Sequence, residues 1–237
     1  MSFLEDAPRR FYKEASIAER AGAFTVLLDG RPLRTPKTAA LALPTRALAV
    51  AVAAEWNAQE VAILAHSMPV TRLTNVALDF TGDVRAEAEA GVVKYGETDL
   101  LCHRAPDPAP LIARENEAWD PLLAWAERDL GVRLTKIVGI LPQTQPPAAL
   151  AALAAAVRPL DDFALTGLAH GAGLARSAII AFALARRAIS AADAFAAATL
   201  EEHYQLEVWG EDREARERLD NLRAEFEALE TFFAALK

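Results

Sequence analysis

Cysteine is nearly missing from this 237-residue chain, in which Cys102 is the only one. A single cysteine cannot form an internal disulfide, so we expect the chain to work in a reducing compartment. Long hydrophobic runs are missing too, because no apolar stretch reaches the roughly 18 residues of a membrane-spanning helix. Residues 1–10 have neither the apolar core of a signal peptide nor the acid-poor composition of a transit peptide. These absences predict a cytoplasmic protein without a membrane segment.

An excess of positive charge is also missing. The formal net charge is −8 and the pI is about 5.1. Binding to nucleic acid or to an anionic membrane requires clustered Lys and Arg, so we expect neither as a partner.

Motifs for cofactors and metals are missing as well. The nearest approach to a phosphate-binding loop, Gly171-Ala172-Gly173, lacks a third glycine at the right spacing and lies among helical residues. The four histidines never lie three or four residues apart, the spacing typical of a zinc-binding pair on a helix. We therefore predict no cofactor and no metal.

The chain does have strong signals for secondary structure, and its Ala-rich apolar content favours helices. Phe24, Val26 and Leu28 alternate along a strand that runs into Asp29-Gly30, the dipeptide that a type I′ hairpin turn prefers. The apolar residues after Thr45 repeat with helical spacing, so we expect Thr45 to be the N-cap of a helix. The fold class predicted is α+β: residues 1–80 form a small N-terminal α+β domain with a β-hairpin, and residues 81–237 form a larger, mostly helical domain.

In the second domain, Asp120-Pro121 has the pattern of an N-cap and first helical residue, and Gly131 that of a helix end. Residues 174–185 are apolar nearly all round and predict one central, buried helix. Ser190, with Asp193 at the third position, predicts the start of a helix that runs from 191 to 208. Three tryptophans on apolar stripes are expected in the core: Trp56, Trp119 and Trp125.

The last helix is clearly amphipathic. Its apolar residues follow the alternating three-and-four spacing of a heptad: Leu219, Leu222, Phe226, Leu229, Phe233 and Leu236. Fewer than three heptads favour packing against the protein's own body over a coiled-coil dimer, so we expect a monomer.

The segment 200–211 is the candidate functional region. Leu200 and Tyr204 lie one turn apart on a stripe that we expect to face the core, whereas Glu201 and Gln205 form a second, polar stripe. Glu202 lies seven residues before Trp209, so an acid and an indole share a third face. Aromatic anchors with a few charges are typical of protein-binding surfaces, which is the function that this pattern favours.

These residues also resemble a known family. Residues 200–210 read Leu-Glu-Glu-x-Tyr-Gln-x-x-x-Trp-Gly, which is similar to the C-terminal signature of the ATP synthase assembly factor 2 family of chaperones. The similarity continues in order through most of the chain, including Glu55-Trp56, Cys102-x-Arg104 and Trp119-Asp120-Pro121.

The resemblance implies a chaperone, not an enzyme, that holds the unassembled α subunit of the F-type ATP synthase head until the β subunit replaces it. We expect a bacterial member that works in the cytoplasm, because the N-terminal extension that mitochondrial members use for import into the matrix is missing here. An acid of the signature matters in this family, and Glu201 and Glu202 are the matching positions. The expected partner-binding residues are Glu201, Glu202, Gln205, Trp209 and Glu211.

Two other functions remain open at this point. Glu201, Glu202 and His203 lie within one helical turn and could serve a small acid/base enzyme, which would need these groups in one enclosed pocket. The C-terminal heptad helix could instead build a homo-oligomeric scaffold, which would need an exposed Leu/Phe stripe.

Overall fold

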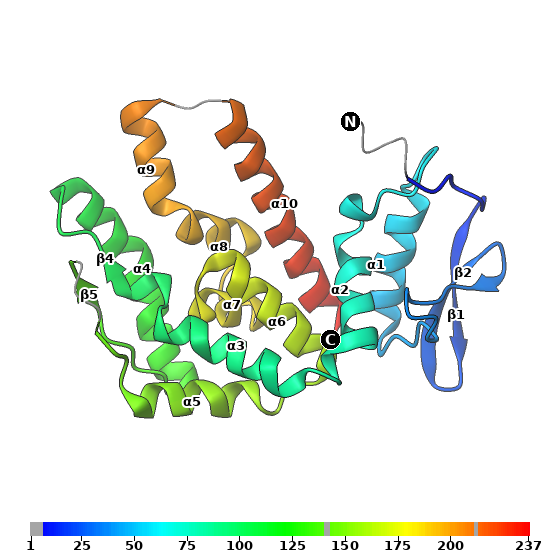
Figure 1. The fold of residues 1–237 in the computed structure, drawn as a ribbon, viewed down its shortest axis with the longest axis horizontal. Coiled ribbons are helices and arrows are strands. Elements are labelled where there is room, and N and C mark those ends of the chain that lie inside the picture. Colours follow the sequence, from blue (N-terminus) through cyan, green and yellow to red (C-terminus); the bar gives the residue numbers. More distant parts are fainter. Residues whose placement is uncertain (1–6, 140–142, 211–212) are drawn as a thin grey trace. The chain divides into compact units, whose positions relative to one another are not determined.

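The computed structural model describes residues 7–139, 143–210 and 213–237 (Figure 1). The protein has an α+β fold, with a small N-terminal sheet and a mostly helical remainder, as predicted. The chain divides into two compact units. The first contains Met1–Val84, Asp162–Thr166 and Thr231–Lys237, and the second contains Arg85–Asp161 and Gly167–Glu230. No helix in the described part of the chain is long and apolar enough to cross a membrane.

The first unit contains a three-stranded antiparallel sheet of order β1-β2-β3, formed by Ala15–Arg20, Ala23–Leu28 and Arg31–Pro32. The predicted hairpin is confirmed, because β2 and β3 are joined by Asp29 and Gly30, whose φ angles of 46° and 81° are the positive values that a type I′ turn requires. The preceding hairpin from β1 to β2 was not predicted. Its turn residues, Ala21 and Gly22, also have positive φ, but alanine is not a usual signal for this turn.

Helix α1 (Arg46–Asn57) packs on β1 and β2. The Thr45 hydroxyl accepts a hydrogen bond from the Leu48 N–H at 3.1 Å, which confirms the predicted N-cap. Leu48, Ala49 and Val52 are buried, whereas Trp56 is only half-buried, although we expected it in the core.

Two acids connect the remaining short elements of the first unit to other segments. These elements are η1 (Ala65–Ser67), α2 (Pro69–Val76) and the π-helical η2 (Ala77–Thr81). The Glu55 carboxylate caps α2, accepting from the Val70 and Thr71 N–H groups at 2.8 and 2.7 Å. Asp79 accepts from the Thr35 hydroxyl at 2.5 Å. Both acids therefore connect elements of the first unit.

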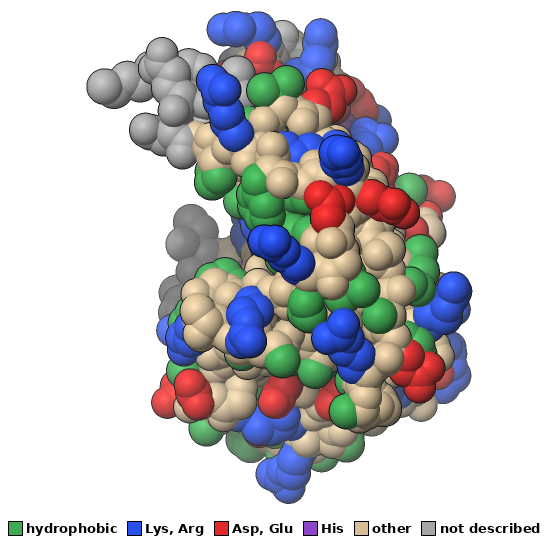
Figure 2. Space-filling view, turned by 90° about the vertical axis from the view of Figure 1, so that its right-hand side faces the viewer, with side chains coloured by type: hydrophobic (Ala, Val, Ile, Leu, Met, Phe, Trp, Pro, Cys, Tyr) green, Lys and Arg blue, Asp and Glu red, His purple; other side chains and the backbone are tan. Residues whose placement is uncertain are grey.

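The surface carries charges of both signs. On the face shown in Figure 2, Lys and Arg side chains are spread singly, with Asp and Glu side chains between them. The hydrophobic side chains of this face form small patches separated by polar groups. Such a mixed surface is ordinary for a protein in contact with water.

The following elements come after Val84. In chain order they are α3 (Arg85–Glu97), η3 (Leu100–Cys102), β4 (His103–Arg104), α4 (Ala109–Leu130), β5 (Ile137–Val138), α5 (Pro147–Val157), α6 (Asp162–Ala175), α7 (Ala178–Ala185), α8 (Ala191–Ala198), α9 (Leu200–Trp209) and α10 (Arg213–Ala235). Strands β4 and β5 pair in parallel. Helices α6 and α10 contribute residues to both units.

Helix α4 does not begin at Asp120-Pro121, so that prediction is wrong. It starts eleven residues before Asp120, at Ala109, and passes through Pro121. The Asp120 carboxylate binds Arg104 at 2.7 Å and Lys136 at 2.6 Å instead of capping a helix end. The predicted end of the helix is confirmed, because Gly131 is its C-cap with a φ of 69°.

Two segments predicted as single helices are each interrupted. The apolar segment 174–185 is interrupted at Arg176, which has a φ of 52°, and α7 starts afresh after the N-cap Ser177. Ser190 and Asp193 form the predicted capping box, but the helix it starts ends at Ala198. Thr199 breaks it, with a ψ of 12° and its hydroxyl bonded to the Phe195 carbonyl at 2.7 Å, so α8 and α9 are separate helices.

The apolar stripe of α10 is used inside the chain. Leu219, Phe226, Leu229 and Phe233 are all buried. The scaffold alternative needed this stripe to be exposed, so the structure gives it no support.

Asp99, the N-cap of η3, is a fully buried acid whose side chain contacts the start of α7. It accepts hydrogen bonds from the Ser177 hydroxyl at 2.7 Å and from the Leu101 and Ile179 N–H groups at 3.1 and 3.2 Å. Burial outweighs these bonds and raises the pKa of Asp99 from 3.8 to about 6.

A pH-dependent loss of stability follows from this raised pKa. Because folded Asp99 keeps its proton to a higher pH than unfolded Asp99, its contribution to stability is complete below about pH 4 and is lost as the pH rises through about 6. Asp99→Asn should lack this loss. We expect its free energy of unfolding, relative to the natural protein, to rise by on the order of 3 kcal/mol between pH 4 and pH 7 in urea titrations. A difference that is independent of pH would contradict this account.

Candidate functional site

Helix α9 presents its C-terminal end to solvent. The Trp209 side chain is 79% exposed and Val208 is 56% exposed, and Gln205 is exposed one turn earlier. Gly210, with a φ of 92°, ends the helix. Glu211, the last of the predicted binding residues, lies outside the described residues. An exposed indole of this size is unusual unless something covers it in a complex.

None of the residues of α9 is buried. Leu200 and Tyr204 were expected to face the core, and this prediction is wrong, because both are partly exposed. The break at Thr199 is the cause, since it separates α9 from the buried stripe of α8, to which Ala194 and Ala198 belong.

Charged contacts join α9 to the helices on either side of it. On one side, Arg114 of α4 forms an ion pair with Glu207 at 2.8 Å, and its guanidinium carbon lies 5.2 Å from the centre of the Tyr204 ring. On the other side, Arg218 of α10 forms an ion pair with Glu202. Because partly exposed ion pairs contribute little to folding, these two contacts add little to the stability of the protein.

Glu201 contacts a buried polar cluster at the centre of α4. Its carboxylate lies near that of Glu115, whose side chain is fully buried and accepts from the Ala105 N–H at 3.1 Å. Burial raises the pKa of Glu115; the Ala105 hydrogen bond and nearby Arg104 oppose this increase, and the Glu201 carboxylate adds to it.

The buried Arg104 organises the rest of this cluster. Its guanidinium donates to the Leu101 carbonyl, to Asn116 and to Asp120 at 2.9, 3.0 and 2.7 Å. Although burial acts in the opposite direction, hydrogen bonds from Lys136 and Arg104 hold the pKa of Asp120 below its ordinary value. Arg104 therefore binds β4 and η3 to α4.

The three groups of the enzyme alternative point to different neighbours. Glu201 contacts Glu115 and Glu202 contacts Arg218. The Nδ1 atom of His203 lies 3.0 Å from the Thr199 carbonyl oxygen, and its ring meets Phe195 edge-on. They do not converge on a shared site for acid/base chemistry.

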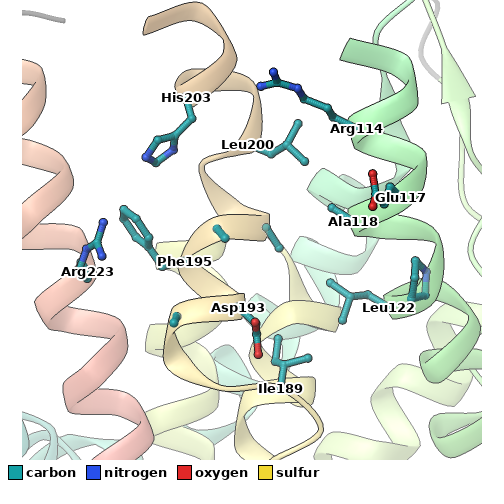
Figure 3. A pocket seen from close by; sticks show the side chains of 14 residues that line it. Arg114, Glu117, Ala118, Leu122, Ile189, Asp193, Phe195, Leu200, His203 and Arg223 are labelled. Carbon is teal, nitrogen blue, oxygen red and sulfur yellow. The ribbon is translucent and has the colours of Figure 1, made fainter. Parts of the chain in front are cut away.

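A groove of about 690 Å³ lies beside α9. Figure 3 shows Leu122, Ala118 and Glu117 of α4 on one side of α8 and α9, and Arg223 of α10 on the other. Leu200 and His203 of α9 also line it. The groove places α9 beside residues of α4 that lie more than 70 residues earlier in the sequence, and no local pattern indicates these neighbours.

The described residues contain no cluster of three or more His, Cys, Asp or Glu side chains that could hold a metal ion. Cys102 is fully buried, and burial raises the pKa of its thiol to about 12, so it is not a reactive thiolate at neutral pH.

Comparisons with known proteins place this architecture in a family. Residues 9–127, just over half of the chain, match the family described as ATP12 chaperone protein. The chain belongs to the ATP12 chaperone family. It is 26% identical over 225 residues to the mitochondrial protein atp12 of Schizosaccharomyces pombe, covering 90% of this chain and 77% of the yeast protein.

Solved structures of ATP12 chaperones and related proteins have the same fold. Atp12 from Paracoccus denitrificans is 38% identical, with a TM-score of 0.90 over 97% of this chain and 99% of its own. Atu1473 from Agrobacterium tumefaciens is 39% identical, with a TM-score of 0.93 over 97% of this chain and 87% of its own. The protein is thus a chaperone of ATP synthase assembly and not an enzyme, as the sequence resemblance implied.

Proposed function

We propose that this ATP12 chaperone binds the unassembled α subunit of the F-type ATP synthase head and shields its interface until the β subunit replaces it. It works as a monomer in the cytoplasm, without cofactor, nucleic acid or membrane. The partner-binding residues in this proposal are Glu201, Glu202, Gln205, Trp209 and Glu211.

The observation that carries the proposal is the exposed end of α9. An indole that is 79% exposed, on a helix without a buried residue, contributes little to the fold. Tryptophan is enriched among the residues that dominate binding energy at interfaces, where it fills a pocket of the partner. The most economical role for Trp209 is therefore contact with the client subunit.

A role as a transient cover suits both proteins. A subunit of a ring exposes apolar interface before its neighbours arrive, and such surfaces aggregate. A cover that must later leave is expected to bind through an interface near the lower end of the usual size range, with a polar rim. Glu202, Gln205 and Glu207 supply polar groups on the same helix as Trp209.

The proposal is tested with purified α subunit, β subunit and assembled heads. In size-exclusion chromatography with light scattering, we expect a 1:1 complex with free α and no complex with assembled heads. Added β should displace the chaperone from α. Co-purification with intact heads in the absence of free α would contradict the proposal.

A further inference from the structure

The groove beside α9 has an apolar lining. Nine of its fourteen lining residues are apolar: Ala118, Pro121, Leu122, Ile189, Ala192, Phe195, Ala196, Ala197 and Leu200. Four of these are alanines, whose small side chains help to leave a space of about 690 Å³. An open groove with this lining is complementary to a row of apolar side chains on a partner.

Two opposite charges flank the groove without forming ion pairs. Glu117 of α4 is exposed and, among the residues that the structure describes, has no hydrogen-bond or ion-pair partner. Arg223 of α10 lies over the Phe195 ring, with its guanidinium carbon 4.6 Å from the ring centre, and forms no ion pair with any described residue. Figure 3 shows the two on opposite sides of α8 and α9. A complementary ligand therefore carries a basic group on the α4 side and an acidic group on the α10 side.

The groove suits a helix better than a strand. Its residues belong to α4, α8, α9 and α10 or directly precede α8, and helices hydrogen-bond their own backbone. An extended segment would find no strand edge among these described elements, and its own N–H and C=O groups would be unpaired against apolar side chains. A helix satisfies these groups internally and presents apolar side chains at positions i, i+3, i+4 and i+7.

We infer that the groove beside α9 binds an amphipathic helix of the α subunit, with a basic residue next to Glu117 and an acidic residue next to Arg223. This inference rests on the proposed function, and it identifies the class of client segment that the chaperone covers. Trp209 then contacts the client beyond the end of the groove.

The test uses the full chain and purified α subunit, with affinity measured by biolayer interferometry. Glu117→Lys and Arg223→Glu each reverse one unpaired charge, and we expect each to weaken binding about tenfold or more. Ala196→Trp should weaken it at least as much, because Ala196 is exposed and the indole fills the groove without disturbing the core. Glu87→Lys and Lys94→Glu, exposed on α3 and outside the groove, are matched controls that should bind within about twofold of the natural protein.

A photo-crosslinking residue at Ala196 then identifies the occupant by mass spectrometry. We expect crosslinks in a helix of α with the stated flanking charges, and reversal of its basic residue should restore binding to Glu117→Lys. If the natural protein binds α but the three groove variants bind equally well, the groove inference fails and the proposed function stands. Crosslinks to a strand of α or to a second copy of this chain also overturn it. If the natural protein does not bind α at all, both fail.

Discussion

Replacing Arg104 by alanine should lower the free energy of unfolding by about 3–5 kcal/mol, because it removes a buried cation from beside the buried acid Glu115 and leaves the Leu101 carbonyl without its donor. The guanidinium is nearly fully buried and makes three hydrogen bonds, to Leu101, Asn116 and Asp120. Urea denaturation followed by circular dichroism measures the loss. Arg104→Lys should recover only part of it, because an ammonium group cannot reproduce the planar arrangement of donors.

Arg133→Ala is the matched control for Arg104. Arg133 also forms an ion pair with an acid, Glu127, but its side chain is 80% exposed and that of Glu127 is 46% exposed. Since exposed ion pairs contribute little, we expect a loss below about 1 kcal/mol. Equal losses of stability for the two arginines would contradict the claim that burial makes the Arg104 contacts important for folding.

Trp119→Ala should cost about 3–5 kcal/mol of stability, as expected for removing a fully buried aromatic side chain. The Trp119 side chain is 0% exposed, and its Nε1–H donates to the Ala197 carbonyl at 2.9 Å, connecting α4 to α8. The substitution therefore creates a cavity and also removes the partner of a buried carbonyl. A loss below about 1 kcal/mol would mean that the surrounding helices close the cavity.

Trp209→Ala provides the comparison, because the same substitution is made at a site that is 79% exposed. Its effect on the free energy of unfolding should stay within about 0.5 kcal/mol. Thermal unfolding of both variants under identical conditions distinguishes a tryptophan that supports the fold from one that does not.

Signals that act over a few residues predicted the structure well. Asp29-Gly30 forms its hairpin turn, Thr45 caps α1, Ser190 and Asp193 form their capping box, and Gly131 ends α4. Each of these structures is determined by hydrogen bonds or φ angles within about four residues, so the local sequence is sufficient.

Features that depend on distant contacts were missed. Helix α4 continues through Pro121 and uses Asp120 in the Arg104 cluster, where the local pattern indicated a helix start. The break at Thr199 is local, but it was missed as well, because helical periodicity continues across it. As a result the exposure of Leu200 and Tyr204 was wrongly predicted.

The candidate site was partly accessible from the sequence. Its location on the segment 200–211 came from the signature residues, but the neighbours of Glu201 and Glu202 did not. Glu115 and Arg218 lie on other helices, the first 86 residues before Glu201 and the second 16 residues after Glu202. Only the fold shows that the two adjacent acids face different helices, α4 and α10.

The affinity of Trp209→Ala for free α subunit is the most direct test of the central claim that α9 binds the client without supporting the fold. Isothermal titration calorimetry should show binding weakened about 30-fold or more, the effect of losing an interface hot spot, with an unchanged melting temperature. Phe11→Ala, which removes an aromatic side chain that is 73% exposed in the first unit, is the control and should bind like the natural protein. Trp209→Ala that folds normally and binds α as tightly as the natural protein would contradict the account.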